Sequence, residues 1–332
     1  MRRICILVIF ISLLVASCSS GDKRLKVDVS DVKIPEVIIH RYDLDLFSMG
    51  KGPLQQGLEV LKPSYRFFLD TDLGNPVKLA EMKAYLENPR NVDFYQAVNS
   101  AYKDIGDLEK QMTFAFRHYL HYYPDSRLPV VFAYVSGGDY DYPVQFADSV
   151  LLIGLDNYLG GDYKAYVADG LPVYRLTRMT PGNIIPDCMR VLANITQPAA
   201  MPGNTLLEQM VEAGKKLYFI DAMIPGTPDR YKIGYSQSHY DWIRANESHV
   251  WAAIIENKML FSADGQTIRV FMADGPFTAE FSKDSPARLG EWIGWQIVRH
   301  YMAENSAVTL PGLMSERDAQ KILTESRYKP AK

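Results

Sequence analysis

Cysteine is scarce in this sequence: Cys5, Cys18 and Cys188 are the only three in 332 residues. The first two belong to an apolar N-terminal run and its end, so Cys188 alone stands in the rest of the chain. No disulfide framework is therefore available, and we expect stability to come from packing. The composition suits this, because 47% of the residues are hydrophobic, which is enough for a full core.

An excess of positive charge is also missing. The chain has 36 Lys and Arg against 39 Asp and Glu, a formal net charge of −3. A protein that binds nucleic acid broadly carries a strongly basic face. We therefore expect no nucleic-acid partner.

The short motifs that mark common catalytic sites are absent as well. There is no H-E-x-x-H zinc motif, G-x-S-x-G elbow, P-loop or G-x-G-x-x-G loop. His118 and His121 stand three residues apart without the Glu base of a zinc peptidase, so a buried or surface pair is favoured over a metal site. His249 and His300 are predicted to be core histidines. Cys188 is predicted to be a core residue, because a free cysteine behaves as a small buried hydrophobe. We predict no catalytic residue, no metal and no cofactor.

The N-terminus is typical of an exported lipoprotein. Arg2 and Arg3 precede an apolar run from Ile4 to Ala16, which is shorter than the roughly 20 residues that span a bilayer. The run ends in Val-Ala-Ser-Cys, which resembles the site of lipoprotein signal peptidase. Residues 1–17 are thus predicted to be a signal peptide and Cys18 the lipidated N-terminus. Polar residues 18–34 are predicted to form a tether.

The hydrophobic patterns predict an α+β fold with a small mixed β-sheet and a mostly helical C-terminal part. Residues 35–332 are expected to form a single domain, α/β to about residue 180 and helical over 181–332. The predicted strands are Glu36–Phe47, Leu128–Val135 and Ser149–Leu155. Residues 54–122 are predicted to be helical, with a break at Asp72-Leu73-Gly74-Asn75-Pro76 and the clearest helix at about 104–122. Further helices are predicted at about 183–197, 204–222, 240–261, 286–304 and 315–326. Ser285 with Pro286, and Ser315 with Asp318, are expected to start the last two helices.

Two segments are predicted to be long loops, which in compact domains are often functional. The first, Ile224–Tyr240, is rich in polar and aromatic groups, and a plain connector is an equally good interpretation. Its candidate contact residues, with one neighbour beyond its end, are Asp229, Arg230, Tyr235 and Trp242. The second, Ala273–Ser285, ends at a predicted helix start, where backbone N–H groups could receive an anion.

Several segments in a fixed order resemble the gliding motility lipoprotein GldB family of Bacteroidota. They include Arg41-Tyr42-Asp43, Asp156-Asn157-Tyr158-Leu159-Gly160, Arg178-Met179, Ile184 to Asp187, Asp221-Ala222, Asn246-Glu247, Gly275-Pro276-Phe277-Thr278 and Trp292-Ile293-Gly294-Trp295. The resemblance implies an association with gliding motility and, by proximity, with type IX protein secretion. Asp221 and Glu247, which belong to these segments, are added to the candidate binding residues.

The segment order is also similar, more weakly, to zinc peptidases of the gluzincin type. The helix around Asp187 would correspond to their active helix, and Glu212 falls where a later Glu ligand would lie. Because that helix carries no His and no Glu, the metal ligands and the general base are missing. The resemblance therefore implies a peptidase-like scaffold without catalysis, with Asp187 and Glu212 as remnants of a site.

Three functions stay open at this point. The preferred one is a membrane-anchored, non-catalytic envelope lipoprotein that works with other motility or secretion proteins. The alternatives are a zinc-peptidase-like hydrolase with an unrecognised site, and a glycan- or peptide-binding lipoprotein. No strongly acidic run follows Cys18, which favours the periplasmic side, while the inner and outer membranes are equally compatible with the sequence.

Overall fold

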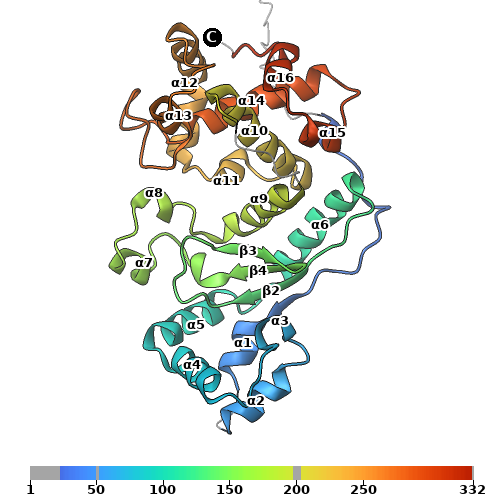
Figure 1. Cartoon of the computed structure of the whole chain (residues 1–332), viewed down its shortest axis with the longest axis vertical. Helices are drawn as coiled ribbons and strands as arrows, with labels where there is room; N and C mark the ends of the chain where they lie inside the picture. Colours follow the sequence, from blue (N-terminus) through green and yellow to red (C-terminus); the bar gives the residue numbers. More distant parts are fainter. Residues whose placement is uncertain (1–22, 50–51, 197–202, 331–332) are drawn as a thin grey trace, which may run out of the picture.

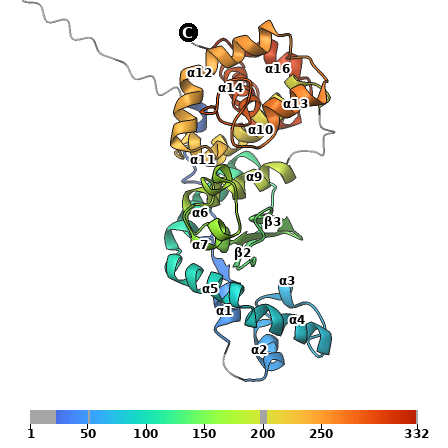
Figure 2. The same cartoon turned by 90° about the vertical axis from the view of Figure 1, so that its left-hand side faces the viewer.

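The computed structural model describes residues 23–49, 52–196 and 203–330, and Figure 1 shows their arrangement. The signal peptide and Cys18 lie outside the described residues. The fold is α+β, as predicted: a small mixed sheet lies near the middle of the long axis, with helices of both halves of the chain around it (Figures 1 and 2).

The sheet has the strand order β1-β2-β4-β3, with β1, β2 and β4 parallel and β3 antiparallel to β4. Its strands are β1 (Ile39–Arg41), β2 (Val130–Tyr134), β3 (Val144–Ala147) and β4 (Val150–Gly154). Every residue of β4 is buried, which explains why its sequence is continuously apolar rather than alternating. Side chains of β2 alternate between two cores, with Val131 and Ala133 on one face and Phe132 on the other.

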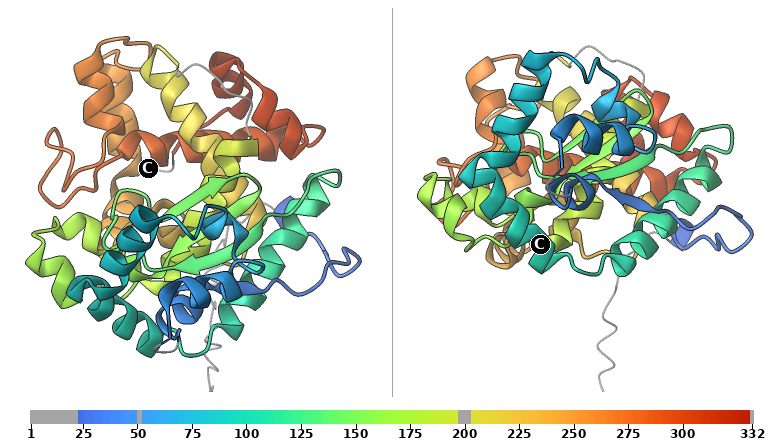
Figure 3. Two further views of the ribbon diagram at one scale, coloured as in Figure 1. Left: turned by 60° about the horizontal axis from the view of Figure 1, so that its bottom comes forward. Right: turned by 90° about the horizontal axis from the view of Figure 1, so that it is seen from below.

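Helices cover both faces of the sheet, as Figure 3 shows with the blue and teal helices in front of it and the yellow to red ones behind. The first face packs on α1 (Tyr42–Phe47), α2 (Leu54–Leu61), α3 (Arg66–Leu69) and α4 (Pro76–Glu87). The second packs on α6 (Gly106–Tyr122) and α9 (Ile184–Thr196), beside α5 (Pro89–Ala101). This second core continues without a break into the helical part of the chain.

The helical part is built around α10 (Leu206–Met223), most of which is buried. Around it lie α11 (Asp229–Ile233), α12 (Gln237–Glu256), α13 (Gly265–Met272), α14 (Leu289–Glu304), α15 (Leu310–Ser315) and α16 (Ala319–Ser326). Helices α10 and α14 cross at Gly214 and Gly294 with their backbones in contact. A Cβ atom on Gly294 would lie 1.8 Å from the carbonyl oxygen of Met210, so only glycine permits this crossing.

The segment that joins the two parts contains short helices only: η2 (Leu155–Asn157), α7 (Lys164–Ala168), α8 (Val173–Leu176) and η3 (Pro181–Asn183). It leaves the carboxyl end of β4 and returns to the sheet through α9. In Figure 1 it forms the lime-coloured projection beside the strands. No helix within the described residues is long and apolar enough to cross a membrane.

Several predicted boundaries are wrong, including that of the helix expected over 240–261, which is α12 and ends at Glu256. The strand expected over Glu36–Phe47 ends at Arg41, and Tyr42 starts a helix whose first turn holds Asp43 and Asp45, where the helix dipole favours acidic side chains. The helix expected from Pro286 begins at Leu289, because the Ser285 hydroxyl bonds to the backbone of Thr278 instead of capping a helix.

The last helix begins at Ala319, with Asp318 as its N-cap, and not at Ser315. The Asp318 side chain accepts a hydrogen bond from the backbone N–H of Lys321, which is the ordinary role of an N-cap carboxylate. Glu316, placed in the predicted capping box, instead accepts hydrogen bonds from the N–H groups of Arg317 and Asp318 before the helix starts.

The first described residues run along the surface of the folded chain. Arg24 donates hydrogen bonds to the carbonyl oxygens of Met302 and Asn305 at the C-terminal end of α14. Leu25 and Val29 are buried. Most of the segment expected as a tether is therefore in contact with the domain from residue 24 onward.

Candidate functional site

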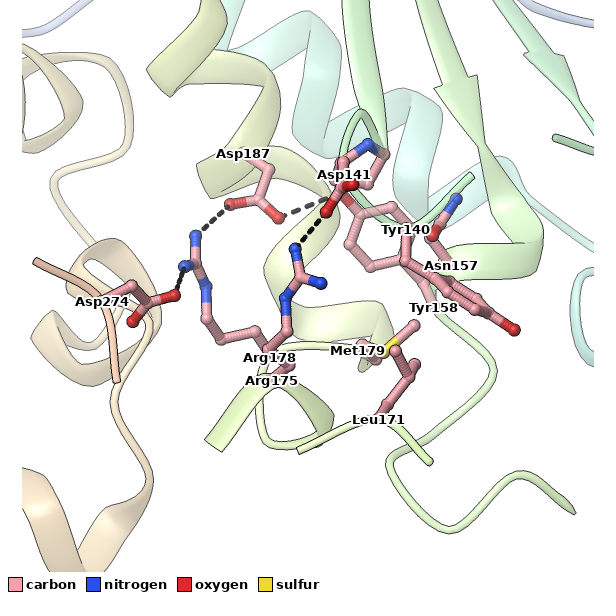
Figure 4. Close-up of a pocket in the computed structure, with 11 residues that line it drawn as sticks. Tyr140, Asp141, Asn157, Tyr158, Leu171, Arg175, Arg178, Met179, Asp187 and Asp274 are labelled. Carbon is pink, nitrogen blue, oxygen red and sulfur yellow. Dashed lines mark hydrogen bonds and ion pairs between the residues drawn. The ribbon is translucent and has the colours of Figure 1, made fainter. Parts of the chain in front are cut away.

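A pocket of about 130 Å³ lies beyond the carboxyl ends of the parallel strands, between the sheet and the helical part (Figure 4). Ligand sites of open α/β sheets are commonly found at this edge. Its lining residues are Tyr140, Asp141, Pro143, Asn157, Tyr158, Leu171, Arg175, Arg178, Met179, Asp187 and Asp274. They come from the loop after β2, the turn after β4, the α7–α8 segment, the first turn of α9 and the Ala273–Ser285 segment.

Asp156, at the end of β4, holds the loops on the sheet side of the pocket. Its buried carboxylate accepts hydrogen bonds from the N–H and hydroxyl of Ser136, at 2.7 and 2.8 Å, and from the N–H of Gly138 at 3.0 Å. Burial raises the pKa of Asp156, and these hydrogen bonds oppose the rise. The same turn presents Asn157 and Tyr158 to the pocket.

Tyr140 is held on the pocket wall by the ion pair between Arg90 and Asp169. Its hydroxyl donates to Asp169 at 2.6 Å, and the guanidinium of Arg90 donates to both oxygens of the same carboxylate. Hydrogen bonds from Arg90 and Tyr140 lower the pKa of Asp169 to about 2. These bonds link α5, the loop after β2 and the end of α7.

Asp187 stands at the inner end of the pocket. It accepts a hydrogen bond of 3.0 Å from the hydroxyl of Tyr158, a tyrosine whose pKa is raised first by burial and then by the Asp187 charge. Two guanidinium groups face its other oxygen without bonding it directly, with Arg178 at 3.8 Å and Arg190 at 4.0 Å. At these distances the two guanidinium groups act on the Asp187 carboxylate through their charge and not through a direct hydrogen bond.

Arg178 occupies the mouth of the pocket between Asp187 and Asp274, each 3.8 Å from its guanidinium (Figure 4). Its side chain passes over Gly234, where an added Cβ would lie 2.8 Å from the Nε of Arg178. Gly234 also has a φ of 76°, which favours glycine. Within the described residues, the guanidinium of Arg178 makes these two ion pairs and no hydrogen bond, so its planar set of N–H donors can reach a ligand.

The other charged groups of the lining are paired. Arg175 donates to Asp141 at 2.5 Å, and this hydrogen bond raises the pKa of Arg175. Asp274 also faces the Nε of the buried Arg288 at 3.2 Å. The lining therefore carries two guanidinium groups and three carboxylates, and Arg288 behind it compensates for the third. Asn157 contributes a buried oxygen, Oδ1, for which the described part of the chain supplies no hydrogen-bond donor.

Of the residues predicted from the sequence, Asp187 lines the pocket and Glu212 does not. Glu212 accepts a hydrogen bond of 3.0 Å from Lys215 on its own helix, and Lys215 continues to the carbonyl oxygen of Glu316. The contacts of Asp187 and those of Glu212 share no residue within the described part of the chain.

Asp221 and Asp229 meet in a buried ion network between α10, α11 and α14. Asp221 accepts hydrogen bonds from Lys232 at 2.7 Å and from Trp295 and Arg299 at 2.8 Å. Arg299 also binds both oxygens of Asp229 at 2.8 Å and lies over the Trp295 ring. Two acids and two bases thus neutralise one another, and the network joins three helices.

The remaining predicted residues make contacts within the fold. The long loop predicted over Ile224–Tyr240 is wrong, because the segment contains α11 and the start of α12. In it, Arg230 stacks on Tyr231, and the buried Tyr235 donates a hydrogen bond to the carbonyl oxygen of Ala287. The other predicted loop, Ala273–Ser285, contains no helix or strand.

Two further candidates on α12 belong to an aromatic cluster. Glu247 accepts hydrogen bonds from the Trp292 indole at 2.8 Å and from the Tyr328 hydroxyl at 2.9 Å. Trp242 packs edge-on against Phe281. These contacts join α12 to α14 and to the C-terminal end of the chain.

The cysteine and histidine predictions have mixed outcomes. Cys188 is fully buried, as predicted, and burial raises the pKa of its thiol. His118 is also buried, 3.0 Å from the carbonyl oxygen of Phe114. The core positions predicted for His249 and His300 are wrong, because both are exposed on their helices. The described residues contain no group of three or more His, Cys, Asp or Glu placed to hold a metal.

Comparison with known proteins gives one result, and it covers nearly the whole chain. Residues 22–330 match the family described as gliding motility protein GldB. The chain belongs to this family. Membership in the GldB family implies a gliding-motility-associated lipoprotein and confirms the resemblance found in the sequence. No curated protein and no solved structure matches the chain, so the similarity to gluzincin peptidases stays a prediction.

Most pocket residues were not singled out from the sequence. A signal for some of them was present, since Asn157, Tyr158, Arg178 and Met179 lie in segments that carry the resemblance to the GldB family. Asn157 and Tyr158 also follow a predicted strand directly, which is where ligand sites gather in parallel sheets. Asp141, Arg175 and Asp274 come from separate loops, and only the fold brings them together.

Proposed function

We propose that this chain is a lipid-anchored, non-catalytic component of the gliding motility or type IX secretion apparatus, facing the periplasm. The observation that carries the proposal is the GldB family match over residues 22–330. The N-terminal signal ending at Cys18 supports the anchor, because one diacylglycerol and one further acyl chain suffice for stable attachment.

Two features of the pocket support a non-catalytic role. Its acids and bases face one another in pairs, which suits a rigid binding surface better than proton transfer. The thiol next to Asp187, Cys188, is fully buried and has a raised pKa, which makes it a poor nucleophile. One tightly held zinc ion per chain, whose removal abolished an activity, would favour a hydrolase instead.

Replacing Cys18 tests the anchor. In Cys18→Ala we expect loss of acyl labelling and release of the protein into the soluble fraction, because no other group in the mature chain would carry the lipid. The matched control is Cys188→Ala, which removes the buried cysteine and should leave labelling unchanged. Acyl label and membrane binding that persist in Cys18→Ala would contradict the proposal.

The association with other envelope proteins has its own test. The lipidated protein, cross-linked in intact cells and purified, should be enriched in motility or type IX secretion components. Enrichment should fall for Cys18→Ala, since the unanchored protein leaves the membrane where these partners lie. Recovery of none of these proteins by the anchored form would oppose the assignment.

A second candidate function, binding of a glycan end, is favoured by the polar groups of the pocket. The guanidinium of Arg178 has N–H groups that make ion pairs at 3.8 Å and no hydrogen bond among the described residues, and the amide of Asn157 lines the same pocket. Sugar hydroxyls suit such groups, since each donates one hydrogen bond and accepts two. The paired charges favour a neutral ligand over an anion. A pocket volume of about 130 Å³ suits one terminal sugar, because pockets for drug-sized ligands measure roughly 300–1,000 Å³.

Arg178→Gln tests this second function. Hydrogen bonds from a charged group contribute about 1.5–3 kcal/mol, so affinity for a bound glycan should fall roughly 10- to 100-fold by calorimetry. Arg230→Gln, outside the pocket, is the control and should bind like the parent. Equal affinities of Arg178→Gln and the parent, or binding of peptides and not glycans, would remove the glycan assignment.

A further inference from the structure

The N-terminal segment fixes how the protein can stand on a membrane. Its first described residues are attached to the C-terminal end of α14, where Arg24 donates to the carbonyl oxygens of Met302 and Asn305. Leu25 packs into the main core, and Val29 is buried further along. A segment held by a guanidinium and by buried side chains does not act as a free linker.

Little chain is left between this attachment and the lipid. Cys18 and Lys23 are five residues apart in sequence. Fully extended, five residues span at most roughly 18 Å, which is shorter than the 20-residue helix α12 at roughly 30 Å. A flexible linker of 20 residues would by contrast have an r.m.s. span of about 25 Å and could extend much further.

We infer that the lipidated protein holds one defined end against the membrane surface, namely the end where α14 and α16 finish. This inference rests on the proposed lipidation of Cys18. We call this surface the α14–α16 end. Its exposed residues are Ala303, Glu304, Ser306, Ala307, Thr324, Glu325 and Arg327.

The α14–α16 end is one continuous surface. Asn305 donates a hydrogen bond to the carbonyl oxygen of Glu325 at 3.4 Å, and Arg327 forms an ion pair with Glu304 at 3.3 Å. Arg24 bonds to the same turn. In Figure 1 these helices lie at the top, and α2 lies at the opposite end of the long axis.

The side chains of this end suit contact with lipid headgroups without insertion into the bilayer. Its two acids, Glu304 and Glu325, are balanced by Arg327 and by the bound Arg24, and none of the large exposed hydrophobic side chains of the described residues belongs to it. It would neither insert into a bilayer nor bind anionic lipid by charge. The anchor therefore sets the orientation, the α1–α4 end points away from the membrane, and the pocket between them opens sideways.

Fluorescence transfer to labelled headgroups tests this orientation in vesicles that carry the full lipidated protein. Single cysteines are introduced by Ala307→Cys at the α14–α16 end and by Val60→Cys on α2, which is 78% exposed. The natural cysteines do not interfere, because Cys18 carries the lipid and Cys188 is buried with a raised pKa. We expect transfer to be several-fold more efficient from position 307 than from position 60.

The outcomes distinguish a wrong orientation from a wrong assignment of lipid to Cys18. Protein that fails to float with vesicles shows that the chain is not lipidated, which overturns both. Protein that floats but gives equal transfer at the two positions, or stronger transfer at 60, overturns the orientation alone. A 20-residue Gly/Ser insertion between Asp22 and Lys23 supplies the control, because it should make the two efficiencies converge.

Discussion

Gly294→Ala is expected to lower the free energy of unfolding by about 3 kcal/mol or more, because the added methyl would meet the backbone of α10. Its Cβ would lie 1.8 Å from the Met210 carbonyl oxygen, and a Cβ on Gly214 would lie 2.2 Å from the carbonyl oxygen of Gly294. Overpacking typically costs about 1–3 kcal/mol when side chains can move aside, and here the obstacle is backbone. Urea denaturation of the purified protein measures the loss.

Gly265→Ala is the control for this prediction. Gly265 is the first residue of α13, and a Cβ there would have no atom within 4 Å. Its stability should stay within about 1 kcal/mol of the parent. Equal urea midpoints for Gly294→Ala and Gly265→Ala would show that α10 and α14 do not cross as closely as described.

Asp221→Ala is expected to destabilise the protein by about 3–5 kcal/mol, because it leaves Lys232 and the indole N–H of Trp295 buried without their acceptor. The matched comparison is Asp229→Ala. Asp229 is 24% exposed, and its loss leaves Asp221 to pair with both Arg299 and Lys232, so we expect a smaller loss of about 1 kcal/mol. Equal losses at the two positions would rule out Asp221 as the centre of the network.

The same network gives a pH dependence with a defined sign. Burial raises the pKa of Asp221, but Arg299 and Lys232 outweigh it and bring the pKa below its ordinary value. Its stabilisation is then complete above the unfolded pKa of about 4 and is lost as the pH falls through the folded value. The stability difference between the parent and Asp221→Asn should therefore narrow below about pH 4. A constant difference down to pH 2 would contradict this.

Hydrophobic patterns were sufficient for the class of fold and for most of its elements. The strands at Val130–Tyr134 and Val150–Gly154 and the helix at Gly106–Tyr122 lie inside or at the edge of the predicted ranges, because burial imposes its period on the sequence. The strand β3 and the helices α7, α8, α11, α13 and α15 were missed. Each is short. The charged residues of α11 are typical of a loop, and only the structure shows that they pair with Asp221 of α10 and Arg299 of α14.

The pocket was less predictable than the fold. Its charged residues come from segments far apart in the sequence, from Asp141 to Asp274. Composition alone does not show which acid pairs with which base. Asp221 and Asp229 illustrate the converse: Asp221 was a candidate because it lies in a segment that carries the resemblance to the GldB family, and Asp229 because it lies in a segment predicted to be a loop. Their partner Arg299, nearly 80 positions away, is the residue that makes them structural.

The N-terminal segment contacts the C-terminal helices in the folded protein, and this affects the order in which the chain can fold. Arg24 bonds to carbonyl groups nearly 280 positions later, and β1 pairs with a strand about 90 positions later. Contacts of such high sequence separation form slowly, and the segments that await them are exposed to aggregation. The first residues to leave the ribosome or a translocation channel are thus among the last to find their place. We expect maturation to finish only when nearly the whole polypeptide has emerged.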